Sequence, residues 1–179
     1  MRRLNAMLSM IILVLFVVHG VLGAFNMMAI GSVTTRVLAW TMTALILIHI
    51  LLGICFTIQT LHAQKKAGAV YFKENRLFWA RRLSGLLVMI LIFFHIAAFS
   101  GVSKEHYRLP DFEIFQLLTQ ILLVLSIGVH VVTNVKPMLI AFGIKKLKPK
   151  AVDMIFWISA LLLFMVAAFI IYYIRWSAV

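Results

Sequence analysis

The chain contains five apolar stretches, each long enough to cross a lipid bilayer as a helix. They span residues 4–30, 37–61, 78–99, 112–135 and 154–174, and short polar segments join them. A membrane-spanning helix needs about 20 predominantly apolar residues. Hydrophobic residues make up 64% of the 179 residues and charged residues only 12%, a balance that excludes a water-soluble domain. The sequence therefore predicts an all-α integral membrane bundle of five transmembrane helices, forming one domain over residues 1–179.

The first stretch has basic residues before its apolar run, as a secretory signal peptide does. A signal peptide has an apolar region of about 7–15 residues, followed by a cleavage site with small residues. The run that follows Arg3 is longer than this and already contains His19. We therefore expect residues 4–30 to form the first retained helix.

The basic residues of the joining segments fall mostly on one face of the predicted membrane. This face has 13 of the 17 Lys and Arg residues: Arg2, Arg3, Lys65, Lys66, Lys73, Arg76, Arg81, Arg82, Lys136, Lys145, Lys146, Lys148 and Lys150. The opposite face has Arg36, Lys104, Arg108 and Arg175. Basic residues in short loops stay on the cytoplasmic side. The sequence therefore predicts a cytoplasmic amino terminus and an outside carboxyl terminus.

This topology explains most of the net charge of +12. The basic residues border membrane segments and are not interleaved with stacking aromatics, so we expect no nucleic-acid partner. Anionic lipid headgroups and a partner protein on the inner side would both suit such a face. The single cysteine, Cys55, excludes an intrachain disulfide and a multi-cysteine metal site in this chain. A metal in this bundle would need histidine ligands.

Four of the five stretches contain one histidine each: His19, His49, His95 and His130. An ionisable side chain at membrane depth costs roughly 2.5 kcal/mol on insertion scales, so such residues usually have a function. No Asp or Glu lies mid-membrane to form a zinc or di-iron site. Two imidazoles fill both axial positions of a haem iron, and four would bind two haems. The alternative is that the histidines only form hydrogen bonds between helices.

The position of each histidine along its helix favours a pairing by depth. His95 lies about 6 Å and His19 about 17 Å from the predicted outer ends, whereas His49 and His130 lie roughly 18–27 Å from theirs. The sequence therefore favours an outer pair of His19 with His95 and an inner pair of His49 with His130.

Two short repeats accompany the histidines. His19 and His49 each begin a His-x-x-Leu-Gly motif that ends at Gly23 and Gly53. Residues i and i+4 share a helix face, so each glycine leaves an opening beside the imidazole, where a flat macrocycle or a neighbouring helix would fit. An Arg-Arg-Leu repeat begins the first and third stretches, and its Arg82 either reaches the membrane interface or pairs with haem propionates.

The segment Leu77-Phe78-Trp79-Ala80-Arg81-Arg82-Leu83-Ser84-Gly85, followed by His95, is the most specific pattern in the chain. It resembles the aromatic, Arg-x-Ser/Thr-Gly, His pattern of the single-chain, five-helix, two-haem cytochrome b membrane anchor of succinate:quinone oxidoreductases and fumarate reductases. Further matches are Ile48-His49 with Gly53 and a basic loop, His130 with Asn134, and a fifth helix without histidine. The resemblance covers nearly the whole chain.

The resemblance implies two b-type haems, with His19 and His95 as ligands of the outer one and His49 and His130 as ligands of the inner one. It adds Arg82, Ser84, Gly23 and Gly53 as cofactor-binding residues. It also implies flavoprotein and iron–sulfur subunits on the cytoplasmic face, and menaquinone or ubiquinone as substrate. The location would be the prokaryotic cytoplasmic membrane. Dicarboxylate chemistry would belong to the partner subunits, so the chain itself has no dicarboxylate or flavin site.

The second stretch has no acid near its outer end, where family members that react with quinol on that side usually have one. Only Glu105, Asp111 and Glu113 offer a carboxylate there, with His106 beside them. One hypothesis is that one of them exchanges the quinol proton, and the alternative is a solvated polar loop. His62, at the inner end of the second stretch, is interpreted as an interfacial polar residue, with a role toward a propionate or quinone as the alternative.

Two other functions remain open. A dihaem cytochrome b anchor of another dehydrogenase, such as a hydrogenase or formate dehydrogenase, would have two ligands on one helix. A haem-free transporter or assembly protein would use the histidines as proton relays and would lack pigment. The sequence leaves open whether a dehydrogenase complex would oxidise succinate or reduce fumarate.

Overall fold

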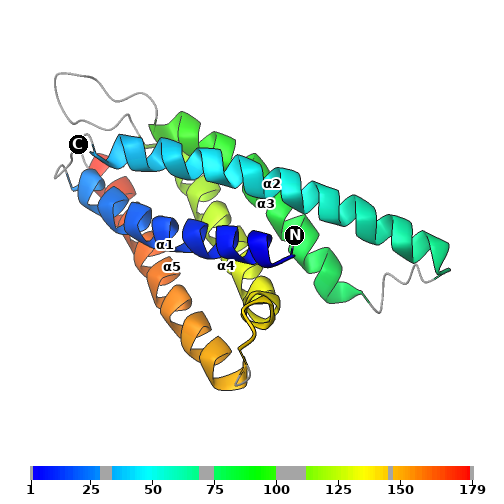
Figure 1. The fold of residues 1–179 in the computed structure, drawn as a ribbon. Coiled ribbons are helices and arrows are strands. Elements are labelled where there is room, and N and C mark those ends of the chain that lie inside the picture. The colour runs from blue at the N-terminus through cyan, green and yellow to red at the C-terminus, as the bar shows by residue number, and fades with distance from the viewer. Residues whose placement is uncertain (1, 29–33, 69–74, 100–111, 145–146, 178–179) are drawn as a thin grey trace.

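The chain forms five long helices, seen in a computed structural model that describes residues 2–28, 34–68, 75–99, 112–144 and 147–177. They are α1 (Arg2–Met27), α2 (Thr34–Lys66), α3 (Arg76–Phe99), α4 (Ile114–Ala141) and α5 (Leu147–Ser177), as Figure 1 shows. Each is long and apolar enough to cross a membrane. The all-α prediction and the prediction of five membrane-length helices are therefore confirmed.

The helices are longer at several ends than the apolar stretches predicted. Helix α2 continues to Lys66, α4 continues to Ala141, and α5 begins at Leu147. The apolar pattern stops where polar residues begin, but the backbone hydrogen bonds of a helix continue through polar flanks. Helix α4 even includes Pro137, which lacks an N–H group and is rare inside a helix. The predicted end of the first stretch, Ile30, lies outside the described residues.

Helices α1 to α4 form a four-helix arrangement in which each helix contacts the next one around the ring. Packed neighbours are α1 with α2, α2 with α3, α3 with α4, and α4 with α1. Across the two diagonals, among the described residues, no Cα atom of α1 lies within 8 Å of one in α3, and none of α2 within 8 Å of one in α4. Directly packed helices have axes about 8–10 Å apart, so the diagonal helices are separated by more than this. The centre of the arrangement lies between them.

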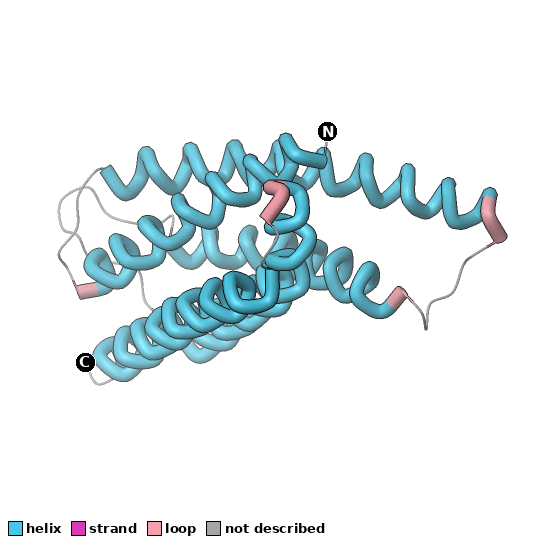
Figure 2. The backbone as a smooth tube through the Cα atoms, turned by 60° about the horizontal axis from the view of Figure 1, so that its bottom comes forward, coloured by secondary structure: helices cyan, strands magenta, loops and turns pink. Residues whose placement is uncertain are grey.

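Helix α5 lies outside this arrangement and packs on α4 and α1. The tube in Figure 2 shows long helical segments, with the described loop residues at helix ends. Helix α2, by contrast, has no buried side chain among its described residues. Helix α2 therefore encloses the centre loosely, and α4 with α3 and α5 forms the dense side of the bundle.

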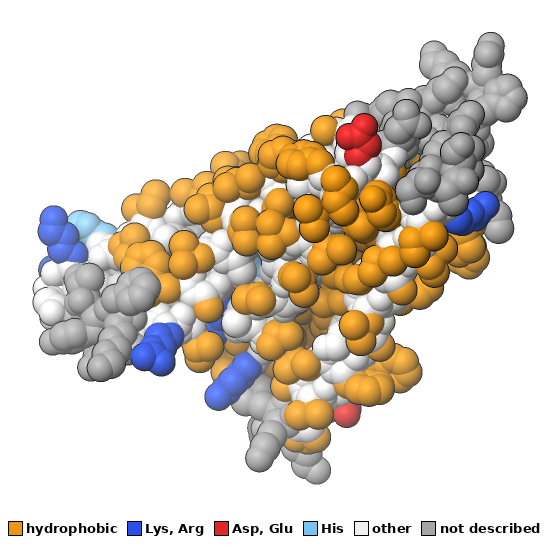
Figure 3. All heavy atoms as spheres, turned by 180° about the vertical axis from the view of Figure 1, so that it is seen from behind, with side chains coloured by type: hydrophobic (Ala, Val, Ile, Leu, Met, Phe, Trp, Pro, Cys, Tyr) orange, Lys and Arg blue, Asp and Glu red, His pale blue; other side chains and the backbone are white. Residues whose placement is uncertain are grey.

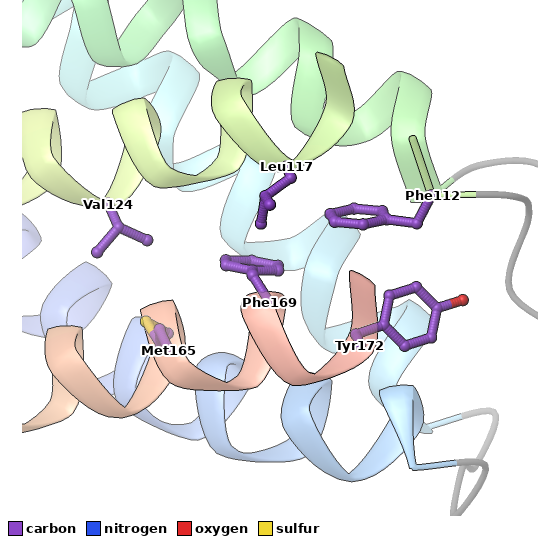
Figure 4. Close-up of a cluster of buried hydrophobic side chains, with 6 residues drawn as sticks. All are labelled: Phe112, Leu117, Val124, Met165, Phe169 and Tyr172. Atoms are coloured by element: carbon purple, nitrogen blue, oxygen red, sulfur yellow. The ribbon is translucent and has the colours of Figure 1, made fainter. Parts of the chain in front are cut away.

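The main buried cluster joins α4 and α5 (Figure 4). Its members are Phe112, Leu117, Val124, Met165, Phe169 and Tyr172. The rings of Phe112 and Phe169 stack with centroids 6.2 Å apart and planes inclined by 9°. Met165 also packs closely on the backbone of α1 at Gly20, where a Cβ atom would overlap its side chain. This cluster fixes α5 against α4 and α1.

The outer surface of the bundle is largely apolar (Figure 3). Large side chains such as Leu51 in α2, Phe93 in α3 and Trp157 in α5 are each more than 60% exposed. Without a hydrophobic driving force between helices in lipid, apolar side chains can face outward at no cost. This surface suits a multi-pass membrane protein.

Candidate functional site

The four histidines meet as two pairs across the two diagonals of the four-helix arrangement. The rings of His19 on α1 and His95 on α3 have centroids 6.0 Å apart, with planes inclined by 71°. The rings of His49 on α2 and His130 on α4 have centroids 6.3 Å apart, with planes inclined by 87°. Both pairs span helices whose backbones do not pack against each other. These are the same pairs that the sequence favours by depth.

The spacing within each pair distinguishes between two ways in which imidazoles interact. A ring nitrogen lies about 1.1 Å from its centroid, so a direct hydrogen bond of about 3.0 Å would place the centroids about 5.2 Å apart. Two imidazoles on one metal ion, each bonded at about 2.0 Å, would have centroids about 6.2 Å apart. The observed 6.0 and 6.3 Å exceed the first value and are close to the second, and they are also distances at which two rings meet edge to face, as both pairs do here.

The two pairs lie at different levels of the bundle. We call the end where α1 and α3 finish and α2 and α4 begin the Met27 end. At about 1.5 Å per residue, His19 and His95 lie about 12 and 6 Å from this end, and His49 and His130 about 22 and 24 Å. The observed helix ends separate the pairs more clearly than the predicted ends do. The two diagonals cross at the centre of the arrangement, so two histidine pairs can both lie there only at different heights along the bundle.

The ring of His130 is held by helix α3. Its Nδ1 lies 3.3 Å from Ser84 Oγ, and the Ser84 hydroxyl donates to the Arg81 carbonyl oxygen, also at 3.3 Å. Because the Ser84 proton is used in this second bond, the Ser84 oxygen accepts from the Nδ1–H of His130. Gly85 gives the ring room, because a Cβ atom there would lie 3.1 Å from Cε1 and 3.3 Å from Nδ1. In this orientation Nε2 is the nitrogen with a free lone pair. Ser84, a predicted site residue, therefore acts on a histidine.

The ring of His95 is held by a residue that the sequence interpretation missed, Gln120 on α4. The His95 Nδ1–H donates to Gln120 Oε1 at 2.7 Å, and Gln120 is fully buried. An amide within an apolar membrane helix was the signal that could have identified it. Nε2 is again the nitrogen that keeps a free lone pair.

Open space borders the pairs at the predicted glycines. A Cβ atom placed on Gly23 or Gly53 would meet no other heavy atom within 4 Å. All four histidines are partly exposed although their rings meet near the centre of the arrangement. The Nδ1 atom of His49 is enclosed and has no hydrogen-bond partner among the residues that the structure describes. A side chain added at Gly23 or Gly53 would therefore meet open space one turn from His19 or His49.

Arg82 lies beside the His49/His130 pair. Its Nη1 donates to the carbonyl oxygen of Gly53, one turn from His49, at 3.4 Å, and its guanidinium lies 5.2 Å from the ring centroid of Phe78. Its Nε is enclosed, and no described residue forms a hydrogen bond with it. An arginine that only reached the interface would not turn toward a neighbouring helix. The position suits an anion in the open space beside the pair.

The predicted acids are placed only in part. Glu113 is the amino-terminal cap of α4, where its backbone N–H donates to Gln116 Oε1 at 3.2 Å in a capping box. Glu105 and Asp111 lie outside the described residues, as does His106. His62 is exposed near the end of α2, and Cys55 is exposed as well.

The residues at both pairs fit a haem. Each pair supplies two imidazoles at the separation that one iron requires, and within the described ranges no third His, Cys, Asp or Glu joins either pair as a metal ligand. A metal ion with two protein ligands needs further donors, which a porphyrin supplies in its plane. No protein-family model, curated protein or solved structure matches this chain.

Proposed function

We propose that this chain is a membrane-embedded electron-transfer subunit that binds two b-type haems. The observation that carries the proposal is that two pairs of histidines meet across the diagonals of one helix bundle, with ring centroids 6.0 Å apart in one pair and 6.3 Å apart in the other. A haem with two axial imidazoles exchanges single electrons and has no open position for oxygen. His19 and His95 are the ligands of one haem, and His49 and His130 are the ligands of the other.

The polar residues around each pair supply the remaining contacts. Ser84 and Gln120 hold two of the imidazoles with Nε2 free, Gly23 and Gly53 leave room for a flat ring, and Arg82 offers its guanidinium to a propionate. Guanidinium forks match carboxylates well. The axial ligands, the space and the counter-charge thus come from helices α1 to α4, and α5 needs no histidine.

The basic residues support an orientation with the Met27 end outside. In Figure 3 blue Lys and Arg side chains gather toward the ends of the bundle, away from its apolar middle. The described basic residues at the end opposite Met27 include Lys65, Lys66, Arg76 and Lys136, and the positive-inside rule places these in the cytoplasm. The His19/His95 haem is then the outer one. The location is the prokaryotic cytoplasmic membrane.

The resemblance of the Leu77–Gly85 segment and His95 supports a finer proposal. The chain is the membrane anchor of a succinate:quinone oxidoreductase or fumarate reductase. Its basic face binds the iron–sulfur and flavoprotein subunits, and it passes electrons between the iron–sulfur subunit and menaquinone or ubiquinone. Glu105, Asp111 and Glu113, on the outer side, include the group that exchanges the quinol proton.

A reduced-minus-oxidised spectrum with haem quantified per chain tests the proposal. Two b-type haems per chain would support it. One haem would require reassignment of two histidines, and none would refute it in favour of a haem-free transporter with histidine proton relays. Copurification with flavin and iron–sulfur subunits would separate the succinate or fumarate complex from an anchor of another dehydrogenase.

A further inference from the structure

Gln120 is the most deeply buried polar side chain among the described residues, with an exposed fraction of 0%. It lies in the first two turns of α4 (Ile114–Ala141), and its side chain is enclosed by the bundle. Burial of an amide in such surroundings costs free energy unless its hydrogen bonds are made. The Gln120 carbonyl oxygen lies 2.7 Å from His95 Nδ1, which is the shorter of the two hydrogen bonds that the described residues make to a ring of the four paired histidines.

A short polar chain sets which end of the amide faces His95. The Thr119 hydroxyl donates to the Gln116 carbonyl oxygen at 2.8 Å, so its own oxygen is free to accept. The Gln120 Nε2–H donates to this Thr119 oxygen at 3.4 Å. The amide carbonyl of Gln120 is then the group that turns to His95, and an acceptor at this place requires a proton on Nδ1.

We propose that Gln120 is the positioning residue of the His19/His95 centre: it keeps the proton of His95 on Nδ1, leaves Nε2 for the metal, and raises the basicity of the ligand. This inference rests on the proposed haem function. An imidazole that donates strongly through Nδ1–H is a more basic ligand, and the loss of such a partner typically costs about 10–100-fold in metal affinity. The effect is specific to the ferric state, because a more basic ligand stabilises the higher charge.

The other histidines show that this bond is not a general feature of the bundle. The His130 ring contacts a hydroxyl at the longer distance of 3.3 Å, and His49 Nδ1 has no partner in the described part of the chain. Among the hydrogen bonds of the described residues, a short bond from a ring of the pairs to a carbonyl oxygen is therefore found at His95 alone. Removing this bond should change the His19/His95 centre alone.

The test compares two variants in membranes containing the full chain. Gln120→Met keeps the length and an unbranched shape but removes the acceptor. Ser126→Ala is the matched control, because Ser126 is buried on the same helix and its hydroxyl donates only to the Leu122 carbonyl of its own helix, at 2.7 Å. The measurements are haem per chain and the midpoint potential of each centre, with the His95→Ala variant used to identify which signal belongs to the His49/His130 centre.

We expect Gln120→Met to raise the midpoint potential of the His19/His95 centre by at least about 59 mV, which for one electron is a tenfold change in the ferrous-to-ferric ratio. Alternatively, the variant should lose the haem of this centre alone. Ser126→Ala should shift neither centre. Unchanged potentials and two retained haems in Gln120→Met would overturn the inference, and so would equal shifts at both centres.

Gln120→Glu keeps an acceptor at the same place, so it provides a second test if the Gln120→Met chain does not fold. Its potential at the His19/His95 centre should stay at or below that of the wild type, and a rise would overturn the inference. Failure of the proposed function is seen separately, because a wild-type chain without haem would show it before any variant is made.

Discussion

Arg82 Nη1 donates across the α2–α3 boundary to the carbonyl oxygen of Gly53, at 3.4 Å. Gly53 lies one helical turn from His49, so the guanidinium is placed beside the His49/His130 pair and not at the end of its own helix. Helices α2 and α3 pack only weakly otherwise. The positive charge is therefore held beside the pair by a specific contact.

The first prediction concerns this charge. Arg82→Gln keeps a hydrogen-bond donor for Gly53 but removes the charge. We expect it to lower the midpoint potential of the His49/His130 centre by about 59 mV, which is about a tenfold change in the ferrous-to-ferric ratio. A nearby cation favours the reduced state, which has one positive charge fewer. Potentiometric titration of both centres measures the shift. Arg76→Gln is the control, because Arg76 is exposed and water screens its charge.

The second prediction uses the open space at Gly53. We expect Gly53→Phe to fold, since a Cβ atom there meets nothing within 4 Å, and to reduce the haem content from two to one per chain. The aromatic ring would occupy the space beside His49 that a macrocycle needs. Ile54→Phe, on the exposed side of the same helix, should keep both haems. Two haems in Gly53→Phe would show that the opening serves only helix packing.

The third prediction tests the ligands of one centre. His130→Ala should leave one haem per chain, and the remaining spectrum should belong to the His19/His95 centre. His62→Ala should retain two haems, because His62 is exposed near the end of α2. Pigment quantified per chain measures both. A His130→Ala chain with two haems would exclude the assignment of the His49/His130 pair.

The fourth prediction concerns quinol oxidation or quinone reduction at the outer face. Glu113→Gln keeps a side-chain oxygen for the cap of α4, so the helix should begin unchanged while proton exchange is lost. We expect quinone turnover in the purified complex to fall about tenfold or more in one of Glu105→Gln, Asp111→Asn and Glu113→Gln. Unchanged turnover in all three would remove these acids from the proposal.

The sequence predicted the five helices because an apolar run of membrane length has few other structures available to it. It placed helix ends less well, since polar flanks such as those of α2 and α5 continue the helix without an apolar signal. Depth along the helices favoured the pairing of His19 with His95, because residues at one level of a bundle can meet, and the resemblance implied the same pair. Patterns in a single sequence identify the functional side chains of each helix more readily than the side chains of other helices that contact them.

Gln120 shows what the sequence could not supply. Its role depends on the rotation of α4 relative to α3, which decides whether the amide meets His95 or another group. The same holds for Gly85, whose motif was recognised but whose contact with His130 needs the packing of two helices. Contacts between helices follow from side-chain packing along the whole interface, and no local pattern encodes them.

The last prediction tests Gly85 directly. We expect Gly85→Val to lose the haem of the His49/His130 centre, because a Cβ atom already lies 3.1 Å from His130 Cε1 and the added methyl groups would displace the ring. Gly128→Val is the control: the nearest atom to its Cβ, at 3.1 Å, is Leu162 Cδ1, the end of a flexible side chain that can move. Haem per chain should fall to one in the first variant and stay at two in the second. Equal losses in both would show that any added bulk in the bundle disturbs the haems, and that the position of His130 does not depend on Gly85.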